Sequence, residues 1–274
     1  MDLASLAADL HDARRRGTRE RQDVVDLRSI GDAYALQREL DALEESARIG
    51  FKLGATLEPA IAMLGLEESF HASLFAEHHY PSGSAIELSG TSPVTVETEF
   101  VVVIGSDIKA GSAAADPGAG GSGTIDEAAV REATAAIVPG FELVATRFDM
   151  SLPGNGLHLV ADSGGNHSTI IGESPDPDAW RELDFHEHPA VLFIDGVRRA
   201  GGHAGHSIGG SPFAMVAALL ERPEFVGRGL KRGELVYCGS CTGMLPVVGG
   251  NRLEADFGAL GRVRVNLTAA RPAR

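Results

Sequence analysis

Cysteine is nearly absent from this sequence: its 274 residues include only Cys238 and Cys241, in the motif "CGSC". Such a pair is compatible with a redox centre or with half of a zinc site. No second pair and no histidine at ligand spacing accompanies it. We therefore assign the two cysteines no special function.

Basic residues are also scarce, since 24 Lys and Arg stand against 38 Asp and Glu, for a formal net charge of -14. A nucleic-acid partner is excluded because phosphates require clustered positive charge. No apolar run approaches the roughly 20 residues of a membrane span. The first residues lack the charged and apolar regions of a signal peptide. We expect a cytoplasmic enzyme with no membrane partner.

The remaining composition, 43% hydrophobic and 23% charged residues, is ordinary for a globular protein. Apolar residues at helical spacing predict helices over 3–16 and 32–47, the second capped by Asp32 and stopped by Gly50. Short apolar runs begin at "FKLG" and indicate strands. We predict an N-terminal helical layer (1–50) followed by a catalytic domain (51–274), with a flexible Gly-rich loop at 110–123.

Two further helices are predicted. One covers 124–138, with Thr124 as its cap and with Pro139 and Gly140 at its end. The other starts near Ser211. Strands are expected in "FELVATRF", "AVLFIDGV", "GELVYCG" and "GRVRVNL". Strands and helices do not alternate regularly enough for a doubly wound sheet, so the fold class is α+β with curved sheet.

The stretch "VETEF" places two acids at the head of an apolar strand. Side chains alternate along a strand, so Glu97 and Glu99 share one face, with Cα atoms about 7 Å apart. The apolar residues that follow on both faces indicate a strand covered on both sides. Either the pair is a solvated strand end, or the two carboxylates hold a hard divalent cation such as Mg²⁺.

Two other charges stand in apolar strands. Glu142 in "PGFELVATRF" is a candidate third ligand, or else the partner of Arg147 or another cation. Lys52 in "GFKLG" is either a surface lysine with its apolar stem covered or, if buried, a proton-transfer group or the partner of a substrate carboxylate.

Six stretches occur in a characteristic order: "AYALQREL", "GFKLG", "VETEF", "PGFELVATRF", "GRGLKRGELVYCGSCT" and "ADFGALGRVRV". In this set the chain resembles the 2-keto-4-pentenoate hydratase and 4-oxalocrotonate decarboxylase branch of the fumarylacetoacetate hydrolase superfamily. The resemblance covers about residues 30 to 267. It implies a fold like the C-terminal domain of fumarylacetoacetate hydrolase, with rolled mixed β-sheets around a metal site and helices outside.

The resemblance also implies residue roles. Glu97, Glu99 and Glu142 fall on the ligands of Mg²⁺ or Mn²⁺, and Lys52 falls on the lysine of the family motif "G-Y-K-I-G". Glu77 falls on the acid of "G-x-L-x-x-D-M", although Ala72 replaces its glycine. We assign catalytic roles to Lys52 and Glu77.

Substrate-binding positions follow in the same way at Ser163, Asn166, Ser240 and Thr242. The family's "A-D-N-A-S" is altered here to "ADSGG", so that Ser163 replaces the asparagine and Gly165 replaces the serine. Asn166, His167 and Ser168 are the candidates to replace the lost polar groups.

The implied function is metal-dependent hydration of a 2-hydroxypenta-2,4-dienoate-type acid, a small 2-oxo acid substrate, to a 4-hydroxy-2-oxo acid. Three alternatives stay open because of the altered stretch: decarboxylation of a 4-oxalocrotonate-type diacid, acylpyruvate-type C–C hydrolysis, and a catalytically silent partner in an enzyme complex. The resemblance further implies a homo-oligomer, and it allows a complex with a pathway enzyme.

Overall fold

The computed structural model describes residues 2–88, 93–110 and 125–269. The predicted loop at 110–123, apart from residue 110, and the predicted cap at Thr124 therefore lie outside the described residues. No helix in the described ranges is long and apolar enough to cross a membrane.

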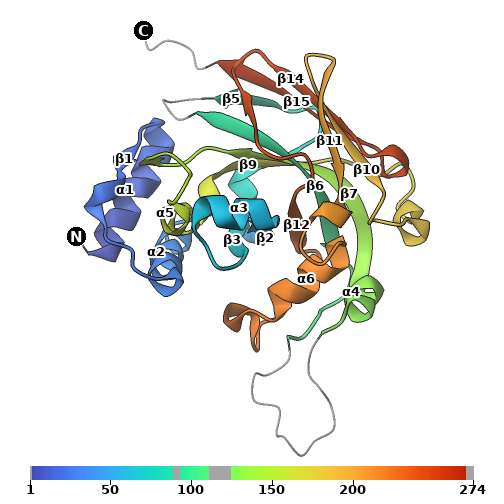
Figure 1. Cartoon of the computed structure of the whole chain (residues 1–274), viewed down its shortest axis with the longest axis horizontal. Coiled ribbons are helices and arrows are strands. Elements are labelled where there is room, and N and C mark those ends of the chain that lie inside the picture. Colours follow the sequence, from blue (N-terminus) through green and yellow to red (C-terminus); the bar gives the residue numbers. More distant parts are fainter. Residues whose placement is uncertain (1, 89–92, 111–124, 270–274) are drawn as a thin grey trace, which may run out of the picture.

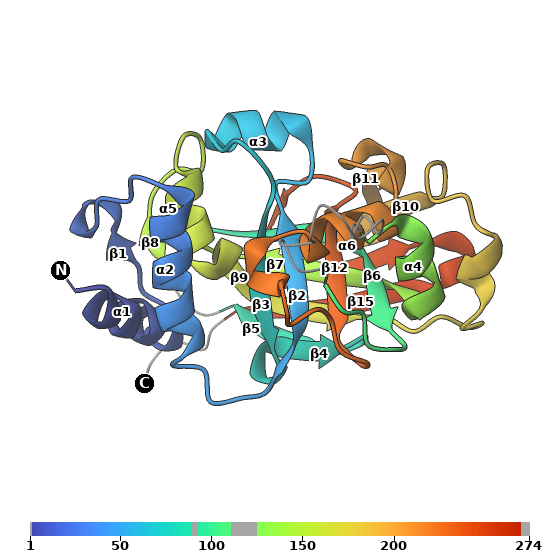
Figure 2. The ribbon, with the colours of Figure 1, turned by 90° about the horizontal axis from the view of Figure 1, so that it is seen from below.

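The described chain contains helices on two sides of a pair of larger sheets (Figure 1). The helices are α1 (Leu3–Arg16), α2 (Ile30–Asp41), α3 (Glu58–Leu64), α4 (Glu127–Ala133), α5 (Gly156–Ala161) and α6 (Pro212–Leu220). In both Figure 1 and Figure 2, α1, α2 and α5 lie at one end of the molecule, and α4 and α6 lie toward the other.

The larger sheet is mixed and carries the candidate site. Its strands, in spatial order, are β3 (Phe70–Phe75), β2 (Arg48–Gly54), β12 (Leu235–Ser240), β6 (Val94–Ile104), β7 (Thr134–Val144), β9 (Asn166–Ile171) and β4 (His79–Pro81), with β13 (Leu245–Val247) also paired to β6. Two of these pairings, β2 with β12 and β4 with β9, are parallel, and the others are antiparallel.

The second sheet has five strands and lies against the first. Its order is β11 (Val197–His203), β10 (Pro189–Ile194), β14 (Arg252–Asp256), β15 (Arg262–Ala269) and β5 (Ala85–Leu88). A short pair, β1 (Glu20–Arg21) and β8 (Phe148–Asp149), links the helical end to the rest. The predicted α+β class with mixed sheets is confirmed.

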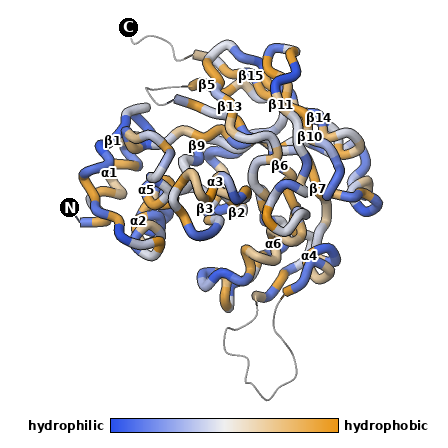
Figure 3. Tube along the Cα trace, viewed as in Figure 1, coloured by the Kyte–Doolittle hydropathy of each residue, from blue (hydrophilic) through white to orange (hydrophobic). Residues whose placement is uncertain are grey.

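The main apolar core is shared by the two larger sheets and α6. Phe100 of β6 contacts Phe185 and Phe257 edge to face, and burial of such rings contributes the largest apolar areas in a core. Helix α6 starts next to Ser211, as predicted, and the Ser211 hydroxyl caps it by accepting from the Ala214 amide. Its apolar residues show along most of its length in Figure 3.

The N-terminal helices have a core of their own. Leu6 and Leu10 of α1 and Leu36 of α2 pack with Phe148 and Val160. The predicted helix at 3–16 is confirmed, with Gly17 in the left-handed conformation after it.

Two predicted helices have different bounds. Ser29 caps α2 instead of Asp32, which completes a capping box three residues later, and the helix ends at Asp41 rather than 47. Leu43, which lies beyond the end of the helix, is exposed. A cap one turn earlier satisfies more free amides at the helix start.

The larger error concerns residues 134–140. They belong to β7, so α4 ends at Ala133, and Pro139 and Gly140 lie inside the strand rather than ending a helix. Pairing with β6 along ten positions outweighs the local helical pattern. Gly140 is needed there, because a Cβ atom would lie 2.4 Å from Cγ2 of Val101.

Candidate active site

Three carboxylates meet where β6 and β7 pair. Glu97 lies directly opposite Glu142, and Glu99 lies opposite Gly140. One oxygen from each acid lies within 4.8 Å of the others. Glu99 and Glu142 are fully buried, and Glu97 is half-buried at the open side. Alternation along β6 and the antiparallel register together bring the three acids that the sequence singled out into one cluster.

The cluster carries more negative charge than its surroundings can solvate. Burial, followed by repulsion from Glu142, raises the pKa of Glu97 to about 7. Burial and repulsion from Glu142 and Glu97 raise the pKa of Glu99 well above its ordinary value. A cation bound to these oxygens would offset both causes, because its charge stabilises the ionised carboxylates.

Fixed donors hold two of the acids in place. The Gly239 amide of β12 donates to Oε2 of Glu99 at 2.6 Å, and Nδ2 of Asn166 donates to Oε1 of Glu142 at 2.8 Å. Oε1 of Glu99 is buried without a hydrogen-bond partner among the described residues. An unpartnered buried carboxylate oxygen beside two other acids fits a hard, oxygen-binding cation such as Mg²⁺ or Mn²⁺.

Lys52 of β2 is the cation of this cluster. Its side chain is 2% exposed, and Nζ lies 3.1 Å from Oε2 of Glu142. Burial alone would lower the pKa of Lys52, but the carboxylates of Glu142, Glu97 and Glu99 outweigh it and raise the pKa. Of the two interpretations of Lys52, the structure supports the buried one. Arg147 is instead paired with Asp162, so it is not the partner of Glu142.

A glycine turn makes room for the lysine. Gly164 has φ +66°, and a Cβ there would lie 2.6 Å from Cε of Lys52. Its carbonyl oxygen accepts from Nζ at 3.4 Å. The altered "ADSGG" stretch therefore contributes a backbone acceptor to Lys52, a role that the sequence pattern did not reveal.

The remaining predicted residues divide into two groups. Ser240 lines the cavity beside Glu97, and its hydroxyl donates to the Gly243 carbonyl at 3.1 Å. The hydroxyl of Thr242 lies 2.8 Å from that of Thr98. Ser163 is buried with φ +51° at the start of the 3₁₀ turn 163–165. These positions stay predictions for substrate binding.

Asn166 and Glu77 have surroundings that the sequence did not predict. Asn166 donates to Oε1 of Glu142, a contact that orients this carboxylate, and substrate binding by Asn166 stays a prediction. Glu77 lines a separate cavity together with Glu44 and His78, and not the cavity that contains Lys52. The structure does not bring Glu77 to the three acids, so we leave it out of the proposed chemistry.

An apolar cavity of about 300 Å³ opens from the acid cluster. Lys52, Glu97 and Ser240 lie on its polar side. The other wall comes largely from α3, from α5 and from the segment before α5. The apolar side chains that line the cavity include Leu57, Pro59, Ala60, Met63, Leu64, Phe70, Val144, Leu152, Leu159 and Met244. No local pattern could reveal this cavity, because its residues come from helices and strands that are far apart in the sequence.

Relatives with known activities match almost the whole chain, although no family model matches it. TodF product hydratase of Pseudomonas putida is 28% identical over 275 residues, which cover 94% of this chain and 92% of that protein. 2-Keto-4-pentenoate hydratase of Burkholderia vietnamiensis is 27% identical over 97% of both chains. 4-Oxalocrotonate decarboxylase of a Pseudomonas species is 24% identical over 89% of both.

Solved structures share the fold. 4-Oxalocrotonate decarboxylase of Pseudomonas putida, complexed with magnesium and adipate, superposes with a TM-score of 0.83 at 21% identity over 97% of both chains. Fumarylpyruvate hydrolase of Pseudomonas aeruginosa, complexed with Mn²⁺ and pyruvate, has a TM-score of 0.58 at 22% identity, covering 82% of this chain and 91% of that one.

The fold is that of the fumarylacetoacetate hydrolase superfamily, as the motifs predicted. In sequence, the chain is similar to 2-keto-4-pentenoate hydratases and to a 4-oxalocrotonate decarboxylase over most of its length.

Proposed function

We propose that this chain is a divalent-metal-dependent hydratase of a 2-hydroxypenta-2,4-dienoate-type acid, producing a 4-hydroxy-2-oxo acid. One observation carries the proposal. Three buried or half-buried carboxylates and the ion-paired Lys52 meet at the polar end of an apolar cavity. The homologous hydratases, matched over nearly the full chain, support the same reaction.

Glu97, Glu99 and Glu142 would hold the metal, Mg²⁺ or Mn²⁺. The chemistry of the donors supports this assignment, since three carboxylates and an unpartnered oxygen suit a hard cation. A bound divalent cation supplies positive charge that stabilises negative charge developing on a substrate oxygen. The solved relatives contain magnesium in one case and Mn²⁺ in another.

Lys52 is the proposed proton carrier. In the overall reaction the 2-hydroxyl proton leaves as C2 becomes a ketone, C5 gains a proton, and water supplies a hydroxyl to C4 and a proton to C3. Nζ lies on the cavity wall and is held 3.1 Å from Oε2 of Glu142, so Lys52 can give a proton to C5 and regain one from the 2-hydroxyl that the substrate loses. The apolar walls keep other water away from the reacting carbons.

The test follows the ultraviolet band of 2-hydroxypenta-2,4-dienoate with enzyme, in Mg²⁺ and after treatment with a chelator. We expect the band to disappear only when Mg²⁺ is present. Mass spectrometry should find the substrate mass plus one water.

Other outcomes separate the alternatives. Loss of carbon dioxide from 4-oxalocrotonate without hydration of the dienoate would indicate a decarboxylase, and release of a second acid from an acylpyruvate would indicate a C–C hydrolase. Metal binding without turnover of any of these substrates would indicate the catalytically silent partner of an enzyme complex. The homo-oligomer and a complex with a pathway enzyme stay predictions.

A further inference from the structure

The cavity beside the acid cluster has its charges at one end only. Among the described residues that line it, Lys52 is the one cationic side chain, and it is already paired with Glu142. The one acid in the lining is Glu97. Beyond these residues the wall consists of aliphatic, methionine and phenylalanine side chains with a few backbone and hydroxyl groups.

Two segments that form this apolar wall are joined by a backbone hydrogen bond. The Gly154 amide donates to the carbonyl oxygen of Met63 at 2.9 Å, joining the end of α3 to the loop that contains Leu152. Met63 lies on this wall and is 42% exposed, so it stands at the rim. A ligand that enters past this rim has its far end against Met63, Leu152 and their neighbours.

The lining distinguishes substrates by the group at this far end. A second carboxylate would lose part of its hydration against these apolar side chains without gaining a free cation, which is unfavourable. Each methylene group placed there makes the binding free energy more favourable, because apolar surface is removed from water. At about 300 Å³, the cavity reaches the size of sites that bind drug-sized ligands, which is more than a five-carbon acid occupies.

We propose that the substrate has a single carboxylate, at the metal end, and an apolar alkyl or aryl substituent at the opposite end. This proposal rests on the proposed function and makes it more specific. It excludes diacids as preferred substrates and assigns Met63 as a specificity-determining residue.

The substrate test compares ligands with one head group and different tails. Turnover in Mg²⁺ is measured with 2-hydroxypenta-2,4-dienoate, with its 5-propyl and 5-phenyl derivatives, and with 2-hydroxyhexa-2,4-diene-1,6-dioate. We expect kcat/KM for the propyl derivative to exceed that for the parent by about tenfold. The diacid should fall below the parent by about 100-fold or more.

Binding of unreactive analogues separates failure of this inference from failure of the proposed function. Calorimetry in Mg²⁺ compares 2-oxohexanoate with 2-oxohexanedioate, which have equal chain lengths, and 2-oxopentanoate with 2-oxooctanoate. The monoacid should bind at least tenfold tighter than the diacid, and the eight-carbon acid tighter than the five-carbon acid. If these affinities hold but no dienoate is hydrated, the function fails and the ligand class stands.

A charge placed at the rim tests the role of Met63. In Met63→Lys the affinity for 2-oxohexanedioate should rise at least tenfold relative to 2-oxohexanoate, while the uncharged Met63→Gln should leave this ratio near that of the original protein. The exposure of Met63 allows both replacements without unfolding. Equal or tighter binding of the diacid by the original protein, or faster turnover of the diacid, would overturn the inference.

Discussion

The buried acids of the cluster lower the stability of the fold when no metal is bound. Glu99 is buried, unpartnered at one oxygen and close to two other acids. Its pKa is raised because burial and its neighbours oppose the charged form. A raised carboxyl pKa means that the folded state loses stability as pH rises past the ordinary pKa of the group.

Glu99→Gln should therefore separate stability from activity. The variant loses a proposed metal ligand, so we expect Mg²⁺-dependent kcat/KM to fall at least about 100-fold. In chelator at pH 8 its melting temperature should equal or exceed that of the original protein, because a buried repulsion is removed. Glu39→Gln on the exposed side of α2 is the matched control and should change neither quantity. Full activity in the Glu99 variant would contradict the metal assignment.

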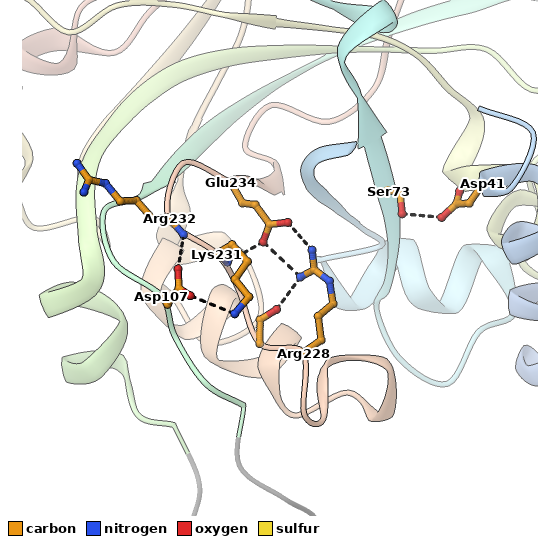
Figure 4. Close-up of polar contacts among 8 residues, drawn as sticks. Asp41, Ser73, Asp107, Arg228, Lys231, Arg232 and Glu234 are labelled. Carbon is orange, nitrogen blue, oxygen red and sulfur yellow. Dashed lines mark hydrogen bonds and ion pairs between the residues drawn. The ribbon is translucent and has the colours of Figure 1, made fainter. Parts of the chain in front are cut away.

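Asp41, at the end of α2, gives a pH dependence of stability away from the site. Figure 4 shows its carboxylate accepting a hydrogen bond from the Ser73 hydroxyl, at 2.6 Å. Burial raises the pKa of Asp41 to about 6, although this hydrogen bond opposes the shift. The unfolded chain releases the same proton near pH 4, so the fold loses stability as pH rises from about 4 to about 6.

Asp41→Asn removes this loss while keeping an acceptor for Ser73. At pH 8 the variant should have a free energy of unfolding larger by about 1–2 kcal/mol, and at pH 4 the difference should vanish. Urea denaturation at both pH values measures it, with the exposed Asp9→Asn as control. A difference that does not depend on pH would rule out this cause.

The residue scale also marks the limit of sequence reasoning about the site. Glu97 and Glu99 are neighbours through strand alternation alone, so they could be predicted together. Glu142 was a candidate third ligand because it stands in a second apolar strand, and the family resemblance favoured it, but its place opposite Glu97 depends on the register between β6 and β7. The contact from Asn166 and the Gly239 amide depend on tertiary packing and on backbone direction, which no local spacing encodes.

At the scale of elements, a charged turn fixes the strand that supplies the Gly239 amide. In Figure 4 the carboxylate of Glu234, the residue just before β12, contacts the Arg228 guanidinium and accepts from the Lys231 amide at 2.8 Å. Asp107 accepts from the amide of Arg232 at 2.9 Å and from Nζ of Lys231 at 3.1 Å. This network anchors the turn where the chain enters the sheet.

Glu234→Ala should therefore destabilise the fold by about 1–2 kcal/mol, since it leaves a half-buried arginine and a backbone amide without their shared acceptor. The measurement is the urea midpoint at constant m-value. Glu224→Ala, at an exposed position of the 3₁₀ turn 223–225, serves as the control and should change stability by less than about 0.5 kcal/mol. Equal effects of the two variants would mean that the network contributes nothing measurable.

Element types were predictable where local pattern and tertiary packing agree. The helix at 3–16 and the helix after Ser211 have caps and apolar stripes that match their final packing. Residues 134–138 lack that agreement. Their alanines favour a helix, but they lie in β7, whose partner strand β6 stands thirty or more residues earlier in the sequence. A local residue pattern carries no information about pairing with so distant a strand.

At the scale of the whole molecule, metal binding should appear as a gain in stability. Adding Mg²⁺ at about 100 times its dissociation constant stabilises the folded state by about 2.7 kcal/mol, which raises the melting temperature by roughly 5–10 °C in a chain of this size. Because the pKa of Glu97 is about 7, protons compete with Mg²⁺ below that pH.

The rise in melting temperature should therefore be larger at pH 8 than at pH 6. Thermal scans at both pH values check this, with Glu99→Gln as the variant that shows no rise. A rise of equal size in that variant would place the ion elsewhere on the acidic surface.

The parallel pairing of β2 with β12 has a consequence for how the protein matures. Lys52 lies beside Tyr237, although the two residues are separated by most of the chain. Contacts of such long range slow folding, because a large loop must close before they form. During synthesis on a ribosome, β6 and β7, which carry the acids, emerge well before β12. Until β12 has been synthesised, Glu99 lacks the hydrogen bond from the Gly239 amide. Competence to bind the ion is thus acquired late in synthesis.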